Sequence, residues 1–115
     1  MTCRKILIVE DEFWVGLNIQ TTLSGAGFDV TGPAVNVLEA KQLLDDHHFD
    51  VAVLDINLGD ETSNEIAYQL SRLKVPFIFL SGYERDNLSP EFIDIPLIEK
   101  PFDEEELINV IREIC

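Results

Sequence analysis

The sequence predicts an α/β fold in which one parallel β-sheet is covered by helices on both faces. Short apolar runs alternate with amphipathic stretches along the whole chain, and five strand–helix pairs fit its length. This alternation is typical of parallel sheets, because each strand must be joined to the next by a crossover, usually a helix. The runs predicted as the first, third and fourth strands are continuously apolar, as expected for strands that are buried on both faces.

The five predicted strands are short and bounded by polar or turn-forming residues. They span residues 5–9, 28–35, 51–54, 76–80 and 97–98. The run at 5–9 is rich in branched residues and too short for a helix. Gly32 and Pro33 interrupt the second run, and a proline inside a strand points to the edge of a sheet.

The stretches between the strands carry apolar residues at helical spacing. Helices are predicted over 12–26, 36–47 and 62–74, and from 103 toward the end of the chain. Gly27 ends the first helix, and Asn36 is placed to cap the second. Asp103 is expected to cap the last helix, whose first turn holds three glutamates that the helix dipole favours.

The segment from 83 to 96 is the least regular part of the sequence. Ser89-Pro90 is a good helix start, but only a short helix fits before Pro96. No linker or low-complexity segment divides the chain, and 115 residues is the size of an ordinary domain. We therefore expect one domain over residues 1–115.

The charge is strongly negative, with 22 acidic and 8 basic residues and a net charge of −14. Such a surface repels phosphate backbones and anionic lipids, so neither nucleic acid nor a membrane is expected as a partner. A cation or a basic protein surface fits the charge better. The sequence has no apolar stretch long enough to span a membrane and no secretion signal at its start, so we expect a cytoplasmic protein.

Two cysteines, Cys3 and Cys115, lie near the two ends of the chain. A pair of isolated cysteines lacks the spaced framework of a disulfide-rich secreted domain. We therefore expect both thiols to be free in a reducing cytosol. A bond between them remains an alternative, because the ends of a compact domain often lie close together.

Polar and charged residues stand where the predicted strands end. In chain order these are Glu10 and Asp11 after the first strand, Asp55 after the third, Ser81 after the fourth and Lys100 after the fifth. Ligands of open parallel sheets bind outside the carboxyl ends of the strands. We therefore expect these five residues to share one site.

The residue types at this edge are those that phosphoryl transfer requires. Crowded carboxylates repel one another until protons or a cation neutralise them, and Mg²⁺ favours carboxylates, retained water and phosphate oxygens. A carboxylate beside the ion can act as a nucleophile and form an acyl phosphate. Lys100 would add a second positive charge and Ser81 a neutral donor for the phosphoryl oxygens. Each residue alone is weak evidence, but together they predict a phosphoryl-transfer site.

Four runs of sequence resemble the receiver domain of response regulators in two-component signalling. They are ILIVEDE at 6–12, VAVLDINL at 51–58, FIFLSGY at 77–83 and LIEKPF at 97–102. The resemblance covers the whole chain. It implies a flavodoxin-like (βα)5 fold, with the five strands in the order 2-1-3-4-5.

The resemblance also assigns roles at the acidic site. It implies that Asp55 is the phosphoacceptor, that Asp11 binds Mg²⁺ directly and that Glu10 assists through water. The backbone carbonyl of Asn57 would complete the protein ligands, and Mn²⁺ would serve as an alternative ion. The chain is then expected to be a signalling phosphoacceptor rather than an enzyme.

The resemblance makes Ser81 and Lys100 the pair that senses the phosphoryl group, with a cis peptide after Lys100. Many receivers carry an aromatic residue three positions before this lysine, where Leu97 stands in this sequence. We therefore hypothesise that Tyr83 and the segment to residue 96 carry the signal by ordering on phosphorylation. Gly59 stands where many receivers have proline, which predicts a more flexible loop after Asp55.

A narrower resemblance suggests the partners. VTGPA, DINLGDE and PFIFLSGY resemble single-domain receivers of alphaproteobacteria, the FAT GUY type. This implies phosphorylation by a histidine kinase, of the HWE or a related class, or by a histidine phosphotransfer protein. Output would come from altered binding to a downstream protein, with the chain a monomer or a weak phosphorylation-dependent dimer. A relay intermediate and a phosphate sink are alternatives.

Two other classes of function also fit parts of the pattern. Aspartate-nucleophile phosphatases place a carboxylate at a strand end, but they use a second aspartate two residues on, where this chain has Asn57. An inert pseudo-receiver would keep the fold and bind partners without phosphorylation. Phosphorylation by a small phosphodonor would separate this last class from a working receiver.

Overall fold

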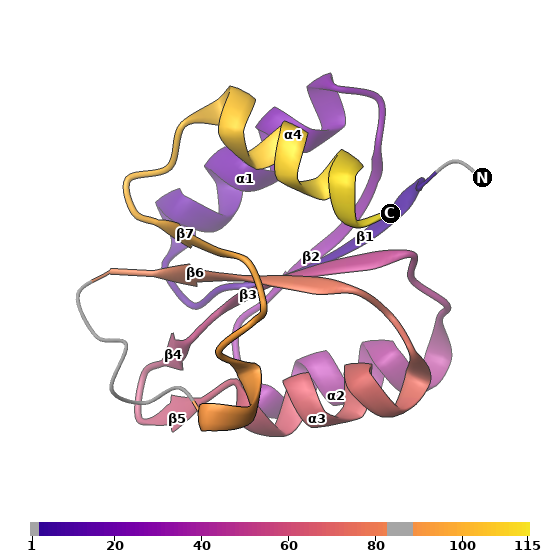
Figure 1. The fold of residues 1–115 in the computed structure, drawn as a ribbon, viewed down its shortest axis with the longest axis vertical. Helices are drawn as coiled ribbons and strands as arrows, with labels where there is room; N and C mark the ends of the chain where they lie inside the picture. The colour runs from indigo at the N-terminus through magenta and orange to yellow at the C-terminus, as the bar shows by residue number, and fades with distance from the viewer. Residues whose placement is uncertain (1–2, 83–88) are drawn as a thin grey trace.

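The computed structural model describes residues 3–82 and 89–115, and its centre is a five-stranded parallel sheet between two layers of helices (Figure 1). The strands lie in the order β2-β1-β3-β6-β7. They span Lys5–Val9 (β1), Asp29–Ala34 (β2), Val51–Asp55 (β3), Phe77–Ser81 (β6) and Leu97–Glu99 (β7). This is the predicted order 2-1-3-4-5, so the predicted fold class is confirmed.

Helices α1 and α4 cover one face of the sheet, and α2 and α3 cover the other (Figure 1). The helices span Phe13–Gly25 (α1), Val37–Asp46 (α2), Asn64–Leu73 (α3) and Glu104–Ile114 (α4), and a short 3-10 helix, η1, spans Pro90–Phe92. The predicted bounds of the four α-helices lie within two residues of the observed ones. None of the helices in the described ranges is both long enough and apolar enough to cross a membrane.

The two predicted caps differ in the structure. The Asn36 side chain accepts a hydrogen bond from Glu39 N at 2.8 Å, so the cap of α2 is confirmed. Asp103 occupies the N-cap position of α4, but its side chain makes no capping hydrogen bond. Its backbone carbonyl accepts the bond from Leu107 N instead, at 3.0 Å. The expected side-chain cap at Asp103 was therefore wrong.

The core is divided by the sheet into two layers, because successive side chains of a strand point to opposite faces. Ile6 and Ile8 of β1 pack with α1 and α4, whereas Leu7 and Val9 pack with α2 and α3. All four are fully buried. This double burial explains why the first strand is apolar at every position after Lys5.

The loop after β3 holds a small antiparallel hairpin that the sequence did not predict. Strands β4 (Asn57–Leu58) and β5 (Glu61–Thr62) pair with each other, and Gly59 turns between them with φ of 64°. Proline, whose ring fixes φ at about −65°, cannot adopt this conformation. The glycine in place of the usual proline thus forms a defined turn here.

Helix η1 is attached to α3 and to the aromatic core. Phe92 is buried, with its ring centroid 5.0 Å from that of Tyr68 and 5.9 Å from that of Phe77. Tyr68 also donates a hydrogen bond to Glu91 Oε1 at 2.6 Å. The short helix expected after Ser89 is present, and its aromatic anchor holds the chain as it approaches β7.

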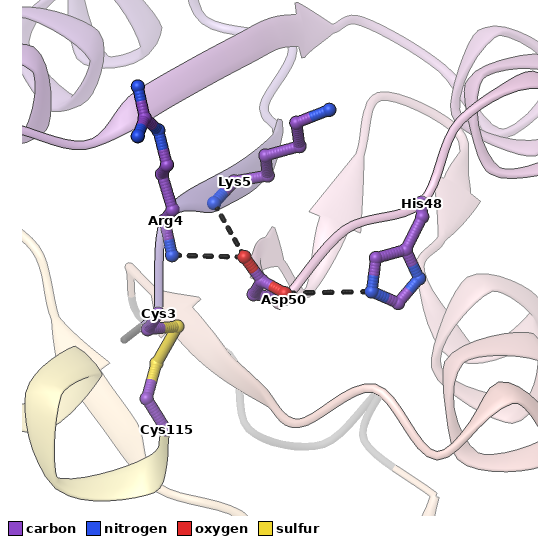
Figure 2. The surroundings of a disulfide bond; sticks show 6 residues. All are labelled: Cys3, Arg4, Lys5, His48, Asp50 and Cys115. Atoms are coloured by element: carbon purple, nitrogen blue, oxygen red, sulfur yellow. Dashed lines mark hydrogen bonds and ion pairs between the residues drawn. A yellow bond between two sulfur atoms is a disulfide. The ribbon is translucent and has the colours of Figure 1, made fainter. Parts of the chain in front are cut away.

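The two ends of the described chain lie side by side, and a disulfide joins Cys3 to Cys115 (Figures 1 and 2). The Cα atoms of the two residues are 5.5 Å apart, which lies inside the usual range for a disulfide. The prediction of two free thiols was therefore wrong. The start of β1 and the end of α4 meet at the same edge of the sheet, which spacing along the sequence does not reveal.

Candidate functional site

The register of the sheet brings the carboxyl ends of β1, β3, β6 and β7 to one edge. Val9 is paired with Leu54, so Glu10 and Asp55 follow at the same level of the sheet. Asp55 in turn pairs with Leu80, the residue before Ser81. The chain after β7 joins this edge too, since Lys100 N donates to the Ser81 carbonyl at 2.8 Å.

Three carboxylates meet at this edge. Glu10, Asp11 and Asp55 each offer an oxygen, and these oxygens lie within 4.8 Å of one another. Glu10 is fully buried and Asp55 nearly so, whereas Asp11 is exposed. Burial, followed by the neighbouring Asp55, raises the pKa of Glu10 to about 8. The site therefore crowds carboxyl groups where the protein around them solvates charge poorly, and Glu10 tends to keep its proton in the absence of a further cation.

Lys100 is the cation that faces these acids. Its Nζ lies 2.8 Å from Glu10 Oε1, 2.9 Å from Asp55 Oδ2 and 3.1 Å from Glu12 Oε1. Burial alone would lower the pKa of Lys100, but Glu10 and Asp55 more than offset it, and the net shift is upward. Lys100 is therefore charged at neutral pH and held against the acids.

The backbone around Asp55 is fixed on both sides. Ile56 N donates to the Leu80 carbonyl at 3.1 Å, and Ser63 N donates to the Ile56 carbonyl at 2.9 Å. The Asn57 backbone N–H points to Asp55 Oδ1 over 3.4 Å, a long contact. Asp55 thus projects from a rigid strand end, with one carboxylate oxygen on Lys100 and the other beside the β4–β5 hairpin.

The donor set fits a hard divalent cation. All three acids supply oxygen, which Mg²⁺ and Mn²⁺ prefer. Glu10 Oε1 is a buried atom for which the described chain supplies one close contact, the ion pair with Lys100 Nζ. The hairpin borders the same place, since a Cβ added at Gly59 would lie 3.8 Å from Asp11 Oδ2. A cation here would compensate charge that one lysine leaves unbalanced.

The remaining predicted residues lie around this cluster or outside the described chain. Ser81 is buried at the end of β6, and Leu97 is half-buried in β7, where it packs against the α2–α3 side of the core. The Lys100–Pro101 peptide is cis, as the resemblance implied. Tyr83 falls outside the described residues. Glu12 was missed as a contact of Lys100, and the third acid of the run Glu10–Glu12 was the available signal.

The sequence is similar to known proteins over nearly its whole length. The family model of the response regulator receiver domain matches residues 6–112. The sensory transduction protein LytT of Bacillus cereus is 30% identical over 113 residues, which cover 95% of this chain and 46% of that protein. The probable transcriptional regulator ycf29 of Porphyra purpurea is 31% identical over 96% of the chain and 56% of its own length. The chain thus spans about half the length of the curated relatives it matches.

Solved structures resemble the chain over nearly its whole length. The solution structure of SdrG from Sphingomonas melonis Fr1 has a TM-score of 0.86 at 31% identity and covers 96% of both chains. The BeF3-activated conformation of SdrG has a TM-score of 0.79 with the same identity and coverage. The chemotaxis response regulator CheY4 of Vibrio cholerae has a TM-score of 0.80 at 26% identity, covering 99% of this chain and 100% of that chain.

Proposed function

Because the chain belongs to the response regulator receiver domain family, whose members are signalling phosphoacceptors, we propose that Asp55 accepts a phosphoryl group in a reaction that requires Mg²⁺. The observation that carries this proposal is the meeting of Asp55 with Glu10 and Asp11 within 4.8 Å, with Lys100 Nζ 2.9 Å from Asp55. Nucleophile, metal ligands and a fixed cation then occupy one strand edge.

Asp55 would act through a carboxylate oxygen that attacks the phosphorus atom of the donor. The new bond is a carboxyl O–P bond, and the donor's bond to phosphorus breaks with its electron pair leaving on the donor. Lys100 would stabilise the negative charge as it passes from the Asp55 carboxylate to the phosphoryl oxygens, because its Nζ already contacts Asp55. The Ser81 hydroxyl, buried at the next strand end, would donate to a phosphoryl oxygen.

Glu10, Asp11, Asp55 and the Asn57 carbonyl are the groups that would hold the ion. Bound Mg²⁺ would neutralise the charge of the phosphoryl oxygens and so lower the barrier to transfer. The chain's part is to hold Glu10 turned inward beside Lys100, 2.8 Å away, whose charge favours the ionised form of Glu10 that a metal ion would bind. Mn²⁺ shares the preference for oxygen ligands and would substitute.

The phosphodonor would be a histidine kinase or a histidine phosphotransfer protein, the partners with which receiver domains interact. We infer a donor of the HWE or a related class from the motifs VTGPA, DINLGDE and PFIFLSGY. A net charge of −14 favours a basic docking surface on the donor and on any downstream partner. Output would come from altered binding to a downstream protein. A relay intermediate and a phosphate sink are the alternatives.

Phosphorylation with a small acyl phosphate and Mg²⁺ tests the proposal, with intact-protein mass as the readout. Wild type should gain the mass of one phosphoryl group, and Asp55→Asn should gain none. Asp60→Asn removes an exposed acid from the adjoining hairpin and should leave the gain intact. A chelator should abolish the gain in wild type. Full phosphorylation of Asp55→Asn, or no effect of the chelator, would contradict the proposal.

A further inference from the structure

The Cys3–Cys115 disulfide lies at the edge of the sheet opposite the acidic site. Cys3 precedes β1, and the neighbouring Asp50 and Pro76 precede β3 and β6, so the disulfide sits at the amino ends of the strands. We propose that this pair is a reversible redox modification site, where a dithiol reductant of the thioredoxin class releases the last turns of α4 from β1. The proposal goes beyond phosphorylation and does not depend on it.

The β1 side of the disulfide is held without it. Asp50 accepts hydrogen bonds from Arg4 N at 3.0 Å and from Lys5 N at 2.9 Å (Figure 2). Asp50 N donates in turn to the Lys5 carbonyl, and Asp29 N donates to the Arg4 carbonyl, both at 2.8 Å. These four bonds fix the residues that follow Cys3. Opening the disulfide would therefore leave the start of β1 in place.

The attachment of the last turns of α4 depends more on the disulfide than the start of β1 does. The first half of the helix is anchored by the buried Leu107 and by Glu104, whose Oε1 accepts a hydrogen bond from Thr22 of α1 at 3.2 Å. Beyond the buried Ile111, no side chain of the described helix forms a hydrogen bond or ion pair with another element. Ile114 is half-buried, and Cys115 is the covalent tie. Release should thus be confined to the last turns.

The disulfide can be reached from solvent. Cys115 is exposed, and both cysteines line a pocket of about 270 Å³. Its walls are mainly apolar, and His48, Asp50 and Lys74 also line it. The ammonium group of Lys74 on this wall favours the thiolate form of an attacking or leaving sulfur. Exposed disulfides are also the ones that exchange most readily.

The exchange balances as a two-electron reduction. One thiolate of the reductant attacks the Sγ atom of Cys115, the more exposed of the two cysteines, forms a mixed disulfide and displaces Cys3 as a thiolate, which takes up a proton. The second thiol of the reductant, as a thiolate, then attacks the first sulfur of the reductant, which is bonded to Cys115 in the mixed disulfide. Cys115 leaves as a thiolate and is protonated, and the reductant departs as its disulfide. An oxidised dithiol partner or glutathione disulfide would reverse the reaction.

Amide hydrogen exchange on the wild-type protein tests the inference directly. Reduction should speed the exchange of amides in residues 111–114 by about tenfold or more, because this turn would open locally. Amides of β1, including Lys5, should keep their rates because Asp50 still holds them. The melting temperature should fall by about 10 °C, since the cross-link closes nearly the whole chain. Equal exchange in both redox states would overturn the proposal.

A variant with both Cys3→Ser and Cys115→Ser is the matched control. It should resemble the reduced wild type and be indifferent to reductant, which excludes effects of the reductant elsewhere. The redox state is then measured by thiol labelling in glutathione buffers and with a thioredoxin. Conversion across these conditions supports a modification site. A pair that stays oxidised throughout, or that never forms under oxidising conditions, would overturn it.

Discussion

Lys100 Nζ donates a hydrogen bond to Asp55 Oδ2 over 2.9 Å, although the two residues are 45 positions apart in the chain. The same amine lies 2.8 Å from the buried Glu10 Oε1. One lysine therefore faces two buried carboxylates, with Asp11 close beside them. The balance of charge explains both why Lys100 matters for stability and why a divalent cation fits the same place.

Removal of this lysine should destabilise the metal-free protein strongly. Lys100→Met leaves the buried carboxyl groups of Glu10 and Asp55 without the cation that faces them, and loss of one partner of a buried pair costs about 3 kcal/mol. The measurement is urea unfolding at neutral pH in the presence of a chelator. Saturating Mg²⁺ should recover part of the loss, because binding to the folded state stabilises it.

Lys41→Met is the matched control for this measurement. Lys41 also forms an ion pair, with Glu65, but 40% of the Lys41 side chain and 60% of the Glu65 side chain are exposed. An exposed pair of this kind contributes about 1 kcal/mol or less. Similar losses in the two variants would show that Lys100 is not compensating buried charge.

The turn at Gly59 should not tolerate a side chain well. Gly59 has φ of 64°, a conformation that costs a residue such as alanine about 1 kcal/mol, so Gly59→Ala should destabilise the protein by about that amount. The control is Gly25→Ala at the end of α1, where an added Cβ meets no atom within 4 Å. That change should be neutral or stabilising. Thermal unfolding of both variants decides, and an equal effect would contradict the assignment of the turn.

Most of the site could be predicted from the sequence because strand ends determine it. Once the run before Asp55 is recognised as a central parallel strand, the residues after its neighbours must lie beside it. Glu10, Ser81 and Lys100 could thus be placed near Asp55 without any knowledge of side-chain conformation. The edge position of β2 also followed from one residue, Pro33.

The features that were missed depend on tertiary packing. The disulfide needs the end of α4 to reach the start of β1, and no local pattern gives that direction. The β4–β5 hairpin has strands of two residues, too short for any periodicity to appear. The contact of Glu12 with Lys100 depends on a side-chain conformation. Local propensity placed Asp103 at the N-cap but could not show that its side chain makes no capping bond.

Phe92 of η1 should contribute more to the free energy of unfolding than its neighbour Ile93. Phe92 is 5% exposed and packs against Tyr68, Phe77 and Phe79, so Phe92→Ala should cost about 3 kcal/mol in unfolding free energy. Ile93, the next residue, is 78% exposed, and Ile93→Ala should change stability little. Urea unfolding of both variants checks this. A small effect at Phe92 would mean that η1 does not depend on this anchor.

The carboxylate of Asp50 should make the stability of the protein depend on pH. The backbone N–H groups of Lys5 and Arg4 lower the pKa of Asp50 below its usual 3.8. A carboxyl with a lowered pKa in the folded state stabilises the protein above the unfolded pKa, and this contribution is lost as pH falls through the folded pKa. Asp50→Asn should therefore be less stable than wild type from pH 7 to about pH 5, by roughly 1 kcal/mol after allowance for partial exposure.

Below about pH 4 this difference should shrink, because Asp50 of the unfolded wild type then takes up a proton, whereas the folded carboxylate, whose pKa is lower, does so only at a lower pH. Urea unfolding at a series of pH values measures the difference at each. His48→Ala is the control, since the His48 side chain is 80% exposed and its Nε2 lies 3.5 Å from Asp50 Oδ1. It should change stability little at any pH. A difference for Asp50→Asn that persisted unchanged to low pH would mean that packing, not the ionised carboxylate, holds the start of β1.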